Sequence, residues 1–148
     1  MVENIELTRR RRTVYMPFWA TTSNPVSGQT VYFSQWGAAP LTTTSVLLGL
    51  FHVAGFIRRM TLNLVVGGTL DSVANSGSAW IRINSATDYL IGTGLLWNAA
   101  FDSNNVIYEN DEIAVSAASW YEIKITYPTF STSPTSVIYS GGLLIEDQ

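Results

Sequence analysis

The chain has 148 residues, the size of about one domain, and its charged residues make up 13% of the sequence, against about 25% in a typical soluble domain. Its five Trp, seven Tyr and six Phe residues favour sheet over helix. Because the chain contains no cysteine, disulfides, thiolate zinc sites and cysteine nucleophiles are excluded. A surface so poor in charge must be polar through Ser, Thr, Asn and Gln, or partly covered by neighbouring subunits.

The N-terminal segment carries most of the charge contrast, since the net charge of the whole chain is −3. Four of the eight basic residues are consecutive: Arg9, Arg10, Arg11 and Arg12. Residues 1–13 show little hydrophobic periodicity, so we predict an extended basic arm there and a single domain over residues 14–148. No apolar segment adjoins the arginines, and we therefore expect no signal peptide.

Short alternating segments follow the arm. Residues 13–19 alternate weakly, and Pro17 restricts such a strand to the edge of a sheet, because proline donates no hydrogen bond to a central ladder. Residues 21–29 hold Thr, Ser, Asn, Pro and Gly and predict a loop. Residues 30–36 predict the next strand.

The most apolar run is Val46–Ile57, far shorter than the ~20 residues of a membrane-spanning helix. Gly49 and Gly55 argue against a helix, so we predict a buried strand pair and no membrane partner. The run contains the one histidine of the chain, His52. Its neighbours supply no nucleophile or second ligand, and we predict that it lies in the core or at an interface.

Later segments alternate clearly with a period of two. The most regular is residues 111–128, where one face holds Tyr121, Ile123, Ile125 and Tyr127. We predict an antiparallel hairpin there, with residues 116–119 as its turn, Asn110-Asp111 as its entry and residues 102–105 as an earlier turn. The predicted core comprises Met60, Leu62, Leu64, Ile81, Ile83, Ile113, Val115, Ile123, Ile125, Val137 and Leu143.

Eight to ten such strands, separated by turn signals at intervals of about 8–12 residues, are typical of a sandwich or a barrel. We predict an all-β jelly-roll sandwich with an extended N-terminal arm.

No constellation of residues indicates catalysis. The sequence lacks the Gly-x-Ser-x-Gly elbow of many serine hydrolases. Neither Gly67-Gly68 nor Gly92-Thr-Gly94 leads into a helix whose N-terminus would bind phosphate. Four carboxylates occur close together in the sequence: Asp102, Glu109, Asp111 and Glu112. Their spacing matches no calcium loop, so an ordinary solvated turn is the better interpretation. We expect no enzymatic activity, no metal and no cofactor.

Two tryptophans, Trp80 and Trp120, fall on the polar faces of their predicted strands. There they could stack on sugars or on a partner. They could equally lie on the second face of strands that are buried on both sides.

The arginine run is the sharpest feature. Four adjacent guanidinium groups repel one another and favour an anionic partner. An anchoring arm for a protein assembly is the leading interpretation, and a solvated tail is the alternative. Nucleic acid is disfavoured as a partner, because the rest of the chain is acidic and would repel phosphates.

Four stretches carry a resemblance to a known family: residues 55–62 (GFIRRMTL), 78–89 (SAWIRINSATDY), 109–115 (ENDEIAV) and 123–129 (IKITYPT). Their order over about residues 55–145 is similar to that in the trimeric, tumour-necrosis-factor-like jelly-roll proteins of tailed bacteriophages. Where those proteins usually have Gly-Asp before the late strand, this chain has Asn110-Asp111.

The resemblance implies a virion structural protein. It implies a homotrimeric decoration (cement) protein bound to the major capsid protein shell of the phage head, with a tail knob that binds a receptor or glycan as the alternative. We lean to decoration, since the chain has no shaft segment and begins with a basic arm.

Overall fold

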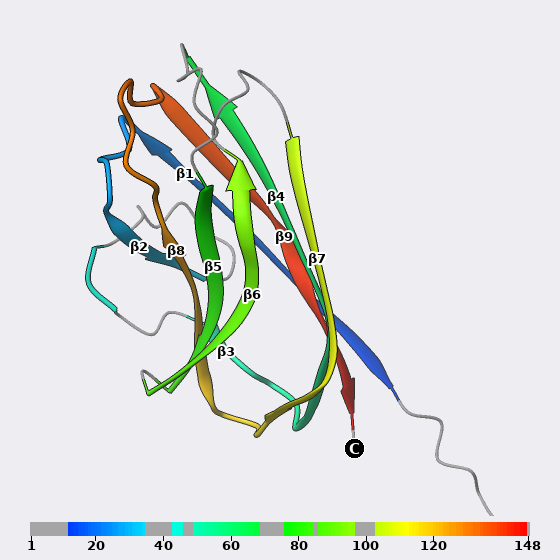
Figure 1. Cartoon of the computed structure of the whole chain (residues 1–148). Helices are drawn as coiled ribbons and strands as arrows, with labels where there is room; N and C mark the ends of the chain where they lie inside the picture. The colour runs from blue at the N-terminus through cyan, green and yellow to red at the C-terminus, as the bar shows by residue number, and fades with distance from the viewer. Residues whose placement is uncertain are drawn as a thin grey trace, which may run out of the picture.

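The computed structural model describes residues 12–34, 43–45, 49–68, 76–84, 86–96 and 103–147. Every regular element in this part of the chain is a β-strand (Figure 1). The strands are β1 Thr13–Ser23, β2 Thr30–Phe33, β3 Gly49–Leu50, β4 Gly55–Gly67, β5 Ser76–Ile83, β6 Thr87–Leu96, β7 Ser103–Val115, β8 Trp120–Thr126 and β9 Ser136–Asp147.

The strands form two antiparallel sheets that face each other (Figure 1). Sheet A has the order β1-β9-β4-β7, and sheet B has the order β2-β8-β5-β6, with β3 also paired to β8. The ladders are nested along the chain: β5 pairs with β6, β4 with β7, β2 and β3 with β8, and β1 with β9. Such nested pairing, wound over two sheets, is the jelly-roll topology, so the predicted fold class is confirmed.

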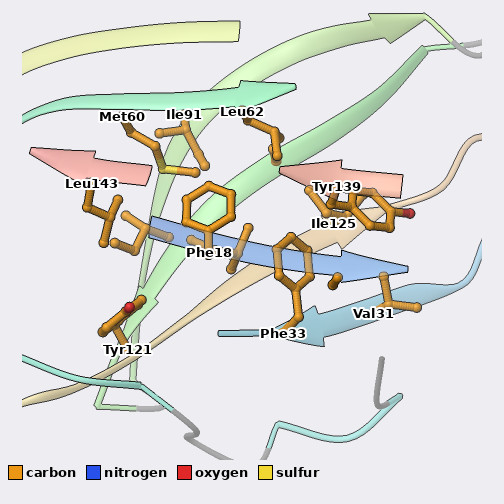
Figure 2. Close-up of a cluster of buried hydrophobic side chains, with 14 of the residues drawn as sticks. Phe18, Val31, Phe33, Met60, Leu62, Ile91, Tyr121, Ile125, Tyr139 and Leu143 are labelled. Atoms are coloured by element: carbon orange, nitrogen blue, oxygen red, sulfur yellow. The ribbon is translucent and has the colours of Figure 1, made fainter. Parts of the chain in front are cut away.

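The core fills the space between the sheets (Figure 2). Phe18 of β1 and Phe33 of β2 meet edge to face, with their ring centroids 5.8 Å apart, which is a favoured aromatic geometry. Every residue of the predicted core is buried: Met60, Leu62, Leu64, Ile81, Ile83, Ile113, Val115, Ile123, Ile125, Val137 and Leu143. The alternation in the sequence therefore assigned the inner faces of these strands correctly.

The position of β1 is also as predicted. This strand lies at one edge of sheet A, where only β9 pairs with it. Pro17 sits opposite Gly142 in that ladder. A proline is tolerated there because an edge strand hydrogen-bonds a neighbour on one side only.

The predicted hairpin over residues 111–128 is wrong. Its inner face is buried as expected, but β7 pairs with β4 in sheet A, whereas β8 pairs with β2, β3 and β5 in sheet B. Residues 116–119 cross from one sheet to the other. Ala118 has a φ of 66° there, and its N–H donates to the carbonyl of Phe51 at 2.8 Å. Alternation tells which face of a strand is buried but not which strand pairs with it.

Two predicted turns are strand instead. Asn104 and Asn105 lie within β7, as does the acidic stretch from Glu109 to Glu112, while Asp102 lies outside the described residues. Ile57 pairs with Ile113 but Arg59 pairs with Glu109, so residues 110–112 are accommodated in a bulge of the ladder.

The predictions for the apolar run before β4 also need correction. His52 is exposed, so it does not belong to the core, and its predicted place at an interface stays a prediction. The adjacent Phe51 is buried in the core, stacked on Tyr121 with ring centroids 4.7 Å apart. Within the described residues of this run, its two strands do not pair with each other, so the expected strand pair does not form there. β3 pairs with β8, whereas β4 pairs with β7 and β9.

Candidate interaction surfaces

The outer face of sheet A exposes large apolar side chains. In β1, Met16 and Phe18 point into the core, so the alternating residues Tyr15 and Trp19 point away from it. Tyr15 is 57% exposed and Trp19 is 44% exposed, and Ile138 of β9 is 40% exposed. Isolated exposed apolar residues are common, but a group on one sheet face is typical of a contact surface.

The strand register joins these residues into one surface, which we call the sheet A face. In neighbouring rows, Pro17 aligns with Gly142 and Thr61, Trp19 with Ser140 and Asn63, and Thr21 with Ile138 and Val65. The sheet A face comprises Tyr15, Pro17, Trp19, Thr21, Thr61, Asn63, Val65, Ile138, Ser140 and Gly142. None of these residues is charged, but the row of Tyr15 continues through Leu144 to Arg59, an exposed cation that borders the face.

A glycine shapes this face at its centre. The ring of Tyr15 lies so close over Gly142 that a Cβ atom on that residue would overlap the ring. One side of the ring therefore covers the backbone of β9, and the other side faces solvent. The glycine allows an aromatic side chain to lie along the sheet surface and broadens the apolar area.

The outer face of sheet B has a different chemistry, because its charges are paired with one another. Asp88 lies between two cations: its Oδ1 is 3.0 Å from Nε of Arg82, and its Oδ2 accepts a hydrogen bond from Nζ of Lys124 at 2.5 Å. The guanidinium carbon of Arg82 also lies 5.7 Å from the ring centroid of Tyr32. Partly exposed ion pairs of this kind add little stability, but they leave few charges to attract an ionic partner.

Trp80 and Trp120 both point outward from sheet B, at separate places. Nζ of Lys124 lies 4.9 Å from the ring centroid of Trp80, so the cation covers the face of that ring. Trp120 is 44% exposed, and its backbone N–H donates to Oδ1 of Asn84 at 2.9 Å. Trp120 and Lys124 are four positions apart on β8, which is about 13 Å along a strand. The two tryptophans therefore do not form one stacking platform.

Of the arginine run, only Arg12 belongs to the described residues, and Arg9, Arg10 and Arg11 lie outside them. The carbonyl of Arg12 accepts a hydrogen bond of 2.8 Å from the N–H of Asp147. This contact lies where β1 begins beside the end of β9 (Figure 1). The last arginine is thus exposed at the rim of sheet A.

Within the described residues, no three histidine or carboxylate side chains lie close enough together to hold a metal ion. A search of the same residues for an apolar helix long enough to cross a membrane found none.

No family model matches the chain, and no curated protein matches its sequence. Among solved structures, a chain in the "Structure of infectious bursal disease virus Gx strain" is similar, with a TM-score of 0.47 and 12% identity. The match covers 94% of this chain and 33% of the viral chain, so this chain spans about a third of the length of the viral chain. A chain of Desmodium yellow mottle tymovirus has a TM-score of 0.29 and 11% identity, over 99% of this chain and 94% of that one. Neither similarity assigns a function to this chain.

The sequence did not point to the sheet A face. Residues 13–19 are apolar or aromatic on both sides of the strand, so their alternation was weak and gave no reason to separate Tyr15 and Trp19 from the core. The available signal was Pro17. An edge strand that is aromatic on both faces has one aromatic face outside the core.

Proposed function

We propose that the chain is a virion structural protein that acts through protein–protein contact. In its most specific form it is a homotrimeric decoration (cement) protein on the icosahedral head of a bacteriophage. The observation that carries this proposal is the uncharged sheet A face, which offers Tyr15, Trp19 and Ile138 to a partner. The jelly-roll fold and the resemblance to phage virion proteins support it.

The proposed mechanism needs no active site. Contact between copies buries apolar and aromatic area that an isolated subunit leaves in water, and such area is what the centre of a stable interface contains. Binding of the trimer to the assembled shell then stabilises the shell by mass action, because the decoration binds the intact shell and not its separated subunits. The arginines of the arm add charge-assisted contacts to carboxylates of the shell.

The test compares the full-length chain with a variant that lacks residues 1–12. Light scattering should give the mass of three 16.3 kDa chains for both, because the sheet A face is unchanged. With phage shells stripped of decoration, the full-length chain should co-sediment and the truncated one should bind more weakly. The difference should shrink at high salt, since screening weakens the contribution of the arm.

The two parts of the proposal fail in different ways. A monomeric protein would overturn the trimer, and equal binding by both variants would remove the arm from the mechanism. If neither variant binds shells, the decoration role is wrong.

The second candidate is a receptor- or glycan-binding module of a phage tail, and the exposed Trp120 favours it. Aromatic rings stack on sugars because one side of a sugar ring is apolar. Adsorption of the protein to bacterial cells, lost in Trp120→Ala but kept in Trp80→Ala, would support it. Absence of adsorption to cells and to their polysaccharide at high micromolar concentration would exclude it.

A further inference from the structure

Within the described residues, the outer edge of β1 has no partner strand, since β1 is the last strand of sheet A and pairs only with β9. The strand is 11 residues long, and its ladder with β9 runs without a register shift. None of its residues is charged. A long, regular and uncharged edge strand is the kind of surface that pairs with a strand of another chain.

The strands at the other ends of the two sheets differ from β1. β2 has only four residues. The ladder of β6 with β5 shifts its register twice, and β6 holds the charged Asp88. The ladder of β7 with β4 shifts once, and the sequence of β7 includes Glu109, Asp111 and Glu112. Short length, bulges and charges are means by which natural sheets avoid edge pairing, and β1 has none of the three.

Hydrogen bonds at both ends of β1 show which of its backbone groups face the free edge. The N–H of Asp147 donates to the carbonyl of Arg12 at 2.8 Å, and the N–H of Asn24 donates to the carbonyl of Thr135 at 2.9 Å. In an antiparallel ladder every second residue bonds across, and the residues between them point their N–H and C=O groups the other way. The even-numbered residues of β1 therefore bond to β9, and the odd-numbered ones face the free edge. Pro17 is among the latter.

The edge-facing row of β1 is interrupted near its middle, because Pro17 has no N–H. This row consists of Thr13, Tyr15, Pro17, Trp19, Thr21 and Ser23. When two copies pair through the same edge about a two-fold axis, both contribute the same residues. A register that includes position 17 therefore lacks one hydrogen bond from each copy. A register that avoids this position has at most three edge-facing residues from each copy, residues 19, 21 and 23.

We propose that Pro17 determines how copies of this chain can associate, because it keeps β1 from pairing edge to edge with β1 of a second copy. The side chains of β1 would favour such a pair, since both faces of the strand carry aromatic residues, Phe18 toward the core and Trp19 away from it. The missing N–H opposes it. Copies are left to meet through the sheet A face, and only this last step rests on the proposed function.

Two substitutions in the full chain test the block. Pro17→Val and Pro17→Thr both restore the N–H, and both residues are good strand formers, but threonine adds no comparable apolar surface. Association through the edge should strengthen by about tenfold or more in each variant, since a two-fold pair gains two hydrogen bonds. Sedimentation at several concentrations should therefore show a species larger than that of the unaltered chain, with circular dichroism to confirm folding.

The matched control is Thr13→Val. It places a valine at an exposed, edge-facing position of β1 that already has an N–H. This variant gains apolar surface but no new hydrogen bond, so it should sediment as the unaltered chain does.

Hydrogen exchange locates the new contact. The amides of Tyr15 and Trp19 face the free edge, so in Pro17→Val they should exchange more slowly as the protein concentration rises. In the unaltered chain they should exchange fast at every concentration. The amides of Met16 and Phe18 bond to β9 and should be protected alike in both proteins.

Three results would overturn the inference. The first is equal sedimentation of Pro17→Val and the unaltered chain, and the second is association of Pro17→Val or Thr13→Val without that of Pro17→Thr, which would assign the effect to apolar surface. The third is a larger species in which the amides of Tyr15 and Trp19 gain no protection, since the contact would then lie elsewhere. None of these results bears on the proposed trimer, which is measured on the unaltered chain.

Discussion

The buried tyrosines of the core differ in whether their hydroxyl groups make a hydrogen bond. Within the described residues, the hydroxyl of Tyr121 has no hydrogen-bond partner although the residue is fully buried. The hydroxyl of Tyr139, in contrast, donates to that of Tyr127 at 2.7 Å in the same core. A buried polar group without a partner carries its desolvation penalty uncompensated, so phenylalanine should be preferred at one position and rejected at the other.

We therefore expect Tyr121→Phe to raise the free energy of unfolding by about 1 kcal/mol at pH 7, and Tyr127→Phe to lower it by about 0.5–1.5 kcal/mol. The physical reason is that the first change removes an unpartnered hydroxyl and the second removes the acceptor for Tyr139. Denaturant unfolding of both variants beside the unaltered chain measures the difference. Destabilisation of the same size in both would mean that Tyr121 has a hydrogen-bond partner.

The same residues predict the response to alkali. Burial raises the pKa of Tyr121 and of Tyr127 to about 12, and it raises the pKa of Tyr139 well above its ordinary value. In the unfolded chain these phenols ionise near pH 10, so between about pH 10 and 12 the folded state binds more protons than the unfolded state. The contribution of these tyrosines to the free energy of unfolding is therefore fully present below pH 10. Above that pH it falls by about 1.4 kcal/mol per pH unit for each such tyrosine. Urea unfolding at pH 9, 10 and 11 measures this fall, and Tyr121→Phe should reduce its slope by the share of one residue.

Ala118 is the one described residue other than glycine and asparagine with a positive φ. An L-residue with a Cβ atom pays about 1–2 kcal/mol in this region, whereas glycine does not. Ala118→Gly should therefore stabilise the protein by about 0.5–1 kcal/mol in thermal or denaturant unfolding. The adjacent Ala117 is exposed and has no positive φ, so Ala117→Gly should destabilise it slightly. The opposite order of the two variants would show that the corner is not strained.

At the scale of elements, β9 is the strand that holds sheet A together, because β1 and β4 pair with it on either side. Its consecutive glycines face opposite ways. A Cβ atom on Gly141 would overlap the backbone carbonyl of Thr61 and approach the ring of Phe18, whereas on Gly142 it would meet the ring of Tyr15, which is 57% exposed. A central backbone cannot move aside, but an exposed ring can.

Gly141→Ala should accordingly cost about 1–3 kcal/mol of unfolding free energy, as overpacking in a core does. Gly142→Ala should cost less than about 1 kcal/mol, because Tyr15 swings into solvent and the unfolded chain loses freedom with the added methyl group. Chemical denaturation of the pair gives the comparison directly. Equal costs at both positions would contradict the assigned faces of β9.

Elements also show what the alternation in a sequence can and cannot predict. The faces of β4, β5 and β8 were correct because every second residue of a strand must point to the same side. The partner of β8 was wrong, because residues 116–119 are as suitable for a crossing between sheets as for a hairpin turn. Glu122 was assigned to a polar outer face by its place in the alternation, and its burial depends on a segment that arrives from 77 residues away, at Ser45.

At the scale of the whole molecule, the proposed trimer predicts that changes in the sheet A face alter self-association. Trp19→Glu places a charge within an uncharged contact surface and should weaken self-association by about thirtyfold or more, as the loss of a central aromatic contact of about 2 kcal/mol does. Leu90→Glu is the matched control, since Leu90 is 48% exposed on the outer face of sheet B and Trp19 is 44% exposed. Sedimentation at several concentrations measures both, with circular dichroism to confirm folding. Loss of association in the control alone would place the contact on sheet B.

The sequence by itself determined the all-β class, the inner faces of β4, β5, β8 and β9 and of the last part of β7, and the edge position of β1. These follow from local rules, the period of two and the missing N–H of proline, which hold whatever else the chain does. Only the tertiary structure decided the strand partners, the exposure of Tyr15 and Trp19, and the burial of Glu122. Each of these depends on which distant segment lies against the strand, and a pattern within one strand holds no information about its neighbour.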